Sequence, residues 1–101
     1  MAVAKRLQDD ARITESTGNV FIDLGFEPAE ARILAMRAEV MWQIERQLKV
    51  QGWTQAESAL QLGISQPRVS RLIKGEWREF TLDTLLKLAL RAGLTPVLQV
   101  V

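Results

Sequence analysis

One glutamine and two arginines, Gln66, Arg68 and Arg71, lie between Gln66 and Lys74, where their side chains could form hydrogen bonds with nucleic-acid bases. A glutamine amide can bond adenine through two atoms, and an arginine guanidinium can bond guanine in the same way. Val69, Leu72 and Ile73 share one face of such a helix, so we expect that face to pack against the protein. The opposite face then presents polar side chains to solvent. We expect base contacts from four residues: Gln66, Arg68, Ser70 and Arg71.

Further residues around this segment are suited to holding phosphate groups. Thr54 and Gln55 begin the preceding helix, whose free amides and positive dipole end attract an anion. Lys74 and Arg78 supply cations beyond the other end of the segment. Pro67 lies on the exposed face in the first helical turn, where its missing amide costs little. The complete predicted DNA-binding set is Thr54, Gln55, Gln66, Pro67, Arg68, Ser70, Arg71, Lys74 and Arg78.

Three segments that begin with a hydroxyl residue and end at a glycine position these side chains. They span residues 54–63, 65–75 and 81–93. Serine and threonine cap helix starts, and glycine is preferred just after a helix end, so each segment predicts a helix. The first also has a capping-box pattern, with Thr54 and Glu57. A single residue separates the first two helices, and a connection this short predicts a helix-turn-helix.

Positive charge is concentrated in one part of the chain. The 101 residues carry a formal net charge of +1. Residues 1–64 hold seven basic and nine acidic side chains, a balance of −2, whereas residues 79–101 balance to zero. Residues 65–78 hold four basic side chains against Glu76 alone, a balance of +3. A local basic surface of this kind suits a polyanionic partner.

Composition argues against several classes of function. The chain has no cysteine and no histidine, which excludes disulfides and zinc fingers and removes the commonest general base. No nucleophile–base set is evident, so we expect no enzyme activity, no metal and no cofactor. The first ten residues lack the apolar stretch of a secretory signal, and no segment has the character of a membrane span. We therefore expect a cytoplasmic protein with no membrane partner.

Three regions follow one another along the chain. Residues 1–19 contain few bulky apolar side chains and several turn formers, which indicates a mobile or partner-dependent arm. Residues 20–94 make up the helix-turn-helix domain, in which residues 28–51 form either one long helix or two joined by a kink. Residues 95–101 are β-branched after a proline and predict a strand. That strand must pair with residues 20–22, with a second subunit or with a partner protein.

Two apolar faces are expected to be covered. In the first helix of the helix-turn-helix, we expect Ala56, Ala59 and Leu60 to face inward. The helix that begins at Thr81 has an apolar arc wider than one small core needs. This surplus indicates a subunit interface.

From Thr54 to Gly75 the sequence TQAESALQLGISQPRVSRLIKG resembles the helix-turn-helix of the XRE-type family of Cro-like and repressor-like regulators. A wider resemblance, over about residues 18–101, extends to antitoxin-like members, including the antitoxins of HigB-type ribonucleases. The resemblance implies an all-α, five-helix domain of the lambda-repressor type, with a short C-terminal strand that we expect to pair across a dimer. It also implies operator binding through these residues: Gln55, Gln66, Arg68, Ser70 and Arg71.

Two functions are compatible with these observations. The first is a transcriptional repressor that binds an inverted-repeat operator in double-stranded DNA as a homodimer. The second is an antitoxin whose main role is to neutralise a ribonuclease-type toxin, with autoregulatory DNA binding. The first is the leading interpretation. The resemblance to the antitoxin-like subgroup, the N-terminal arm and the surplus apolar surface support the second, and a ribonuclease-like neighbouring reading frame would favour it.

Overall fold

A computed structural model describes residues 19–101, which form five α-helices and one 3₁₀ turn and contain no strand. This confirms the all-α class and the five helices, of which the first has only four residues. The predicted arm at residues 1–19 lies outside the described residues, apart from Asn19. The chain divides after Met36 into two compact units, and the division falls within the second helix.

The first unit contains α1, Val20–Asp23, and the beginning of the next helix. Asn19 caps α1, because its side-chain oxygen accepts a hydrogen bond from the Phe21 amide at 2.9 Å. The Asn19 side-chain nitrogen donates to the Ala31 carbonyl oxygen at 3.2 Å. The rings of Phe21 and Phe26 meet edge to face, with centroids 6.2 Å apart. These contacts join α1 to the helix that follows.

The helix α2, Pro28–Gln51, is continuous, so a single long helix replaces the two alternatives that the sequence left open. The Glu27 carboxylate accepts hydrogen bonds from the Ala29 and Glu30 amides at 3.2 and 3.1 Å, which caps the helix start. The helix ends before Gly52, which has a left-handed φ of 71°. Within residues 19–101, no helix combines the length and the apolar character needed to span a membrane.

In the second unit, α3, Gln55–Leu62, begins with the predicted capping box. The Thr54 amide donates to the Glu57 carboxylate at 2.8 Å, and the Glu57 amide donates to the Thr54 hydroxyl oxygen at 3.1 Å. The helix ends at Gly63, which has a φ of 71°. Both signals that were used to place this helix are therefore confirmed.

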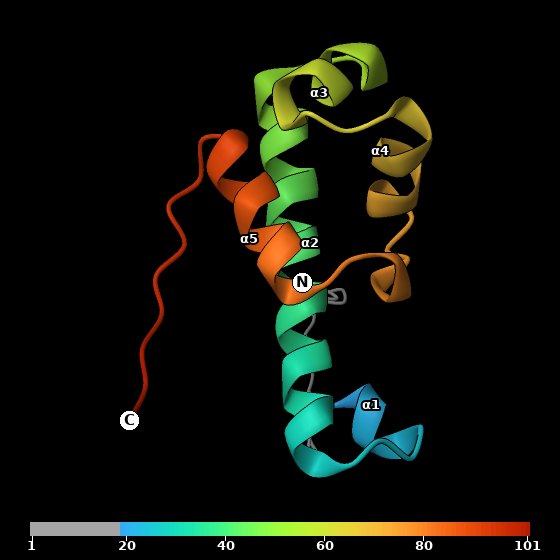
Figure 1. Cartoon of the computed structure of the whole chain (residues 1–101), viewed down its shortest axis with the longest axis vertical. Coiled ribbons are helices and arrows are strands. Elements are labelled where there is room, and N and C mark those ends of the chain that lie inside the picture. The colour runs from blue at the N-terminus through green and yellow to red at the C-terminus, as the bar shows by residue number, and fades with distance from the viewer. Residues whose placement is uncertain (1–18) are drawn as a thin grey trace. The chain divides into compact units, whose positions relative to one another are not determined.

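The helix α4, Gln66–Ile73, follows a three-residue turn, and Figure 1 shows the change of direction between α3 and α4. The Ser65 hydroxyl oxygen accepts a hydrogen bond from the Arg68 amide at 3.3 Å, as expected of a helix cap. A short 3₁₀ turn, η1, Trp77–Glu79, leads to α5, Leu82–Arg91. Thr81 caps α5 by accepting from the Thr84 amide at 3.2 Å.

Apolar side chains from all four helices of the second unit, and from the connection before α5, form one core. Its buried members are Met41, Ile44, Leu48, Leu62, Leu72, Phe80, Leu85, Leu88, Ala89 and Ala92. Trp53 and Trp77 are half-buried and pack against this cluster. The apolar arc of α5 is wider than the buried face, because Leu90 remains 60% exposed.

The prediction for the buried face of α3 is correct for Ala59 and wrong for Ala56 and Leu60. Ser58, Ala59 and Leu62 are the buried residues of this helix. At about 100° per residue, Leu60 lies on nearly the opposite side from that group. Its side chain is accordingly 84% exposed.

The prediction of a C-terminal strand at residues 95–101 is wrong for this structure. These residues form an exposed segment without regular secondary structure, which runs away from the end of α5 (Figure 1). A strand needs a partner for its backbone hydrogen bonds. Residues 20–22, the pairing segment considered within the chain, belong instead to the helix α1.

Candidate nucleic-acid interface

The helix α4 has a buried apolar side and an open polar side. Val69 and Leu72 are 0% and 1% exposed, and Ile73 is half-buried. Ser70, at the edge of the polar side, is also half-buried. The exposed members of the predicted set on or directly after this helix are Gln66, Pro67, Arg71 and Lys74. The division between the two sides therefore follows the helical spacing of the sequence.

Arg68 differs from its neighbours because its head group is engaged with the protein. Its guanidinium carbon lies 4.6 Å from the centroid of the Phe80 ring. Its Nη2 atom donates a hydrogen bond to the Glu79 carbonyl oxygen at 3.5 Å. The side chain is half-buried as a result, and the sequence pattern of α4 carried no signal for this orientation.

The first turn of α3 exposes both predicted residues, Thr54 and Gln55. The capping box uses the amides of Thr54 and Glu57, so the amides of Gln55 and Ala56 remain at the free end of the helix. Those amides and the helix dipole can attract a phosphate. The Glu57 carboxylate, which lies in the same turn, weakens that attraction.

The connection between α4 and α5 carries the remaining predicted cation, Arg78, which is exposed. Its guanidinium carbon lies 4.2 Å from the centroid of the Trp77 ring. Arg37, on α2, donates a hydrogen bond from Nη1 to the Trp77 carbonyl oxygen at 3.4 Å. Sequence reasoning missed Arg37, because nothing local relates it to a residue 40 positions away.

Arg91 holds the turn of the helix-turn-helix from α5. Its Nη1 atom donates to the Leu62 carbonyl oxygen at 3.0 Å, which satisfies a backbone group at the end of α3. A Cβ atom added to Gly63 would lie 3.3 Å from the same nitrogen. Sequence reasoning also missed this contact, which joins α5 to the end of α3.

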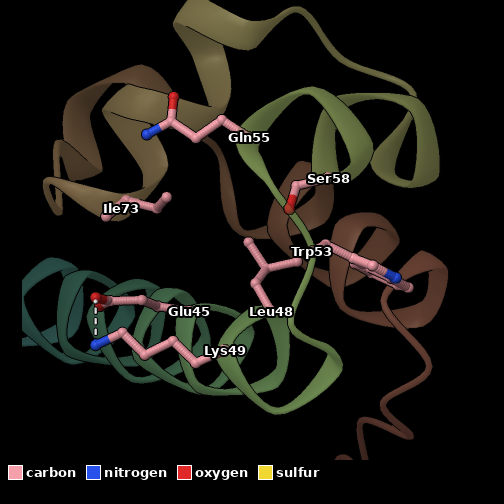
Figure 2. A pocket seen from close by; sticks show the side chains of 7 residues that line it. All are labelled: Glu45, Leu48, Lys49, Trp53, Gln55, Ser58 and Ile73. Atoms are coloured by element: carbon pink, nitrogen blue, oxygen red, sulfur yellow. Dashed lines mark ion pairs between the residues drawn. The ribbon is translucent and has the colours of Figure 1, made fainter.

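A small hollow of about 90 Å³ lies where the end of α2, the start of α3 and the end of α4 meet (Figure 2). Its lining residues are Glu45, Leu48, Lys49, Trp53, Gln55, Ser58 and Ile73. Ser58 is 2% exposed, and Figure 2 shows its hydroxyl turned toward the hollow. Glu45 and Lys49 form an ion pair at 3.4 Å. The volume suits a few water molecules rather than a substrate, and residues 19–101 contain no cluster of acidic side chains able to hold a metal.

The family of helix-turn-helix domains matches residues 20–100, which include all five helices. The chain belongs to this family. No curated protein and no solved structure matched the chain significantly. In a helix-turn-helix domain the second helix of the pair enters the major groove with its N-terminal residues foremost. Here the second helix of the pair is α4, and family membership is consistent with DNA binding.

Proposed function

We propose that this helix-turn-helix protein is a transcriptional repressor that binds an inverted-repeat operator through α4. The observation that carries the proposal is the open polar side of α4, in a capped helix pair of a chain that belongs to this family. We assign base contacts to Gln66, Ser70 and Arg71. Residues assigned to the backbone and the groove wall are Thr54, Gln55, Pro67, Lys74 and Arg78.

The assigned roles follow from the position and chemistry of each side chain. Gln66 is the first residue of α4, so its amide would reach deepest into the groove and could bond adenine. Arg71 is exposed about one and a half turns further along and offers a planar fork of donors to guanine. Lys74 follows the end of the helix, where a flexible ammonium suits a phosphate at any sequence.

We infer that the protein acts as a homodimer. Two copies would place their α4 helices in successive major grooves, about 34–36 Å apart. The 60% exposed Leu90 on α5 supports an apolar subunit contact on this helix. Selection of bound duplexes from a random pool tests this inference. Two half-sites in inverted orientation, separated by one helical turn, are the expected result.

Salt dependence tests whether the binding is electrostatic at all. If each subunit neutralises three or four phosphates, the logarithm of dimer affinity should fall against the logarithm of salt concentration with a slope of roughly −5 to −7. A slope near zero with both random and selected duplexes would contradict DNA binding as the function.

Two variants separate base contacts from phosphate contacts. Arg71→Ala should relax the base-pair preference at one position of the selected duplex. The difference in binding free energy between the preferred and the other base pairs there should fall by about 1–3 kcal/mol. Lys74→Ala should weaken binding to all duplexes about equally and make the salt slope shallower by about 1 per subunit. The measurement is the affinity of both variants for a set of duplexes that each carry one base-pair substitution. The same pattern of affinities for the two variants would overturn the assignment.

The exposed tail supports binding of a protein partner as the alternative function, with autoregulatory DNA binding. Its apolar side chains Val97, Leu98, Val100 and Val101 are each at least 85% exposed. A toxin of the ribonuclease type could cover such a segment. Co-purification of the product of a neighbouring reading frame would favour this alternative, and failure of the two proteins to co-purify when co-expressed would count against it.

A further inference from the structure

The 3₁₀ turn η1 is held in place by arginine side chains from two other helices. Its backbone also forms local bonds, in which the Trp77, Glu79 and Phe80 amides donate to the carbonyl oxygens of Gly75, Glu76 and Trp77 at 2.8, 3.0 and 3.4 Å. Arg37 reaches one carbonyl oxygen of the turn from α2. Arg68 reaches another from α4, and its guanidinium also covers the Phe80 ring.

The position of this turn decides where Arg78 is presented. Arg78 is exposed and its guanidinium lies over the adjacent Trp77 ring, so its direction depends on the orientation of the turn. Phe80 is 1% exposed and cannot itself touch DNA in this conformation. A change that loosens the turn would therefore act on DNA binding through Arg78.

We propose that Arg68 is a positioning residue, which fixes η1, and with it Arg78, against the recognition helix α4. This inference rests on the proposed DNA-binding function and revises the role that the sequence suggested for Arg68. Arginine is suited to this task because its planar guanidinium can cover an aromatic face and donate in its own plane at the same time. Lysine keeps the charge but has no such plane.

A double-mutant cycle tests the proposal, using a duplex that the full-length wild-type protein selects from a random pool. Dissociation constants are measured at one salt concentration for Arg68→Lys, for Arg78→Ala and for the double variant. Each single variant should weaken binding about fivefold, which is typical of one partly exposed cation contact. The double variant should bind no more weakly than Arg78→Ala, because Arg68 acts through Arg78.

A matched cycle with Lys74 provides the control. Lys74 lies at the end of α4 itself, so Arg68→Lys and Lys74→Ala should multiply, giving about a 25-fold loss if each costs about fivefold. Phe80→Leu removes the ring face but keeps an apolar side chain of similar size in the core. If this variant remains folded by circular dichroism, it should reproduce the fivefold loss of Arg68→Lys.

Three results would overturn the proposal. One is a multiplicative loss in the Arg68–Arg78 cycle, which would show that the two residues act independently. Another is a loss confined to one base pair of the duplex, which would make Arg68 a base-reading residue. The last is wild-type protein that binds every duplex without salt dependence or preference, which would remove the proposed function together with this inference.

Discussion

The two connections on either side of α4 are held in different ways. Both begin with a glycine in the left-handed region, Gly63 with φ 71° and Gly75 with φ 76°. The first connection is closed mainly by its own backbone, because the amides of Gly63 and Ile64 both donate to the Ala59 carbonyl oxygen, at 2.9 and 3.1 Å. Arg91 adds one bond from α5.

The second connection, from Gly75 to Phe80, is longer. Its Gly75 and Glu76 amides also donate to carbonyl oxygens of α4, at 3.1 Å each, but it receives bonds from two remote side chains rather than one. Arg37 and Arg68 both donate to its carbonyl oxygens, from α2 and α4. Their bonds, at 3.4 and 3.5 Å, are longer than the 3.0 Å bond from Arg91 to Leu62. Substitutions in the first connection should therefore mainly change the free energy of unfolding. Substitutions in the second connection should have a larger effect on DNA affinity.

The largest expected effect compares the two glycines. Gly63→Ala and Gly75→Ala should both lower the free energy of unfolding, because a left-handed residue with a Cβ atom costs about 1 kcal/mol or more. At Gly75 nothing lies within 4 Å of the added atom, whereas at Gly63 it would meet the Arg91 guanidinium. Arg91 would then have to loosen its bond to Leu62. We expect losses of about 2 kcal/mol at Gly63 and about 1 kcal/mol at Gly75, measured by urea denaturation.

The same substitutions in an Arg91→Ala background provide the control. Without the guanidinium, the costs at Gly63 and Gly75 should become equal within about 0.5 kcal/mol. If the losses in free energy of unfolding at Gly63 and Gly75 remain unequal in that background, the Arg91 guanidinium is not the cause of the difference.

An intermediate effect compares the arginines that hold the two connections. Arg91→Met should lower the free energy of unfolding by about 1 kcal/mol, because the Leu62 carbonyl loses its bond. Arg37→Met should cost less than about 0.5 kcal/mol, because its bond is long and its Nε atom is buried without a partner. Thermal unfolding of both variants measures this. A larger loss for Arg37→Met would reverse the comparison.

The smallest effect concerns Ser58, a buried residue of α3. Ser58 is 2% exposed beside the hollow, and alanine has a higher helix propensity than serine, so Ser58→Ala should raise the free energy of unfolding by about 0.5 kcal/mol. Ser65→Ala is the matched control, since that hydroxyl caps α4 and its loss should cost about 1 kcal/mol. Equal destabilisation by both in urea denaturation would show that the Ser58 hydroxyl has a partner in solution.

Local patterns predicted the parts of the interface that depend on neighbouring residues. The caps at Thr54 and Ser65 and the turn at Gly63 were predicted because each bond joins groups a few residues apart. The buried and open sides of α4 followed from helical spacing for the same reason. Leu60 and the C-terminal strand were mispredicted, because apolar character alone does not decide which neighbour, if any, covers a side chain or pairs with a backbone.

The sequence by itself determined the all-α class, the helix-turn-helix and the division of α4 into a buried side and an open side. Only the tertiary structure decided that Arg68 turns back onto Phe80 and that Arg37 holds the turn before α5. The physical reason is distance along the chain. The Arg68 and Arg37 bonds join residues 11 and 40 positions apart, and such pairs meet only when the packed core brings their helices together.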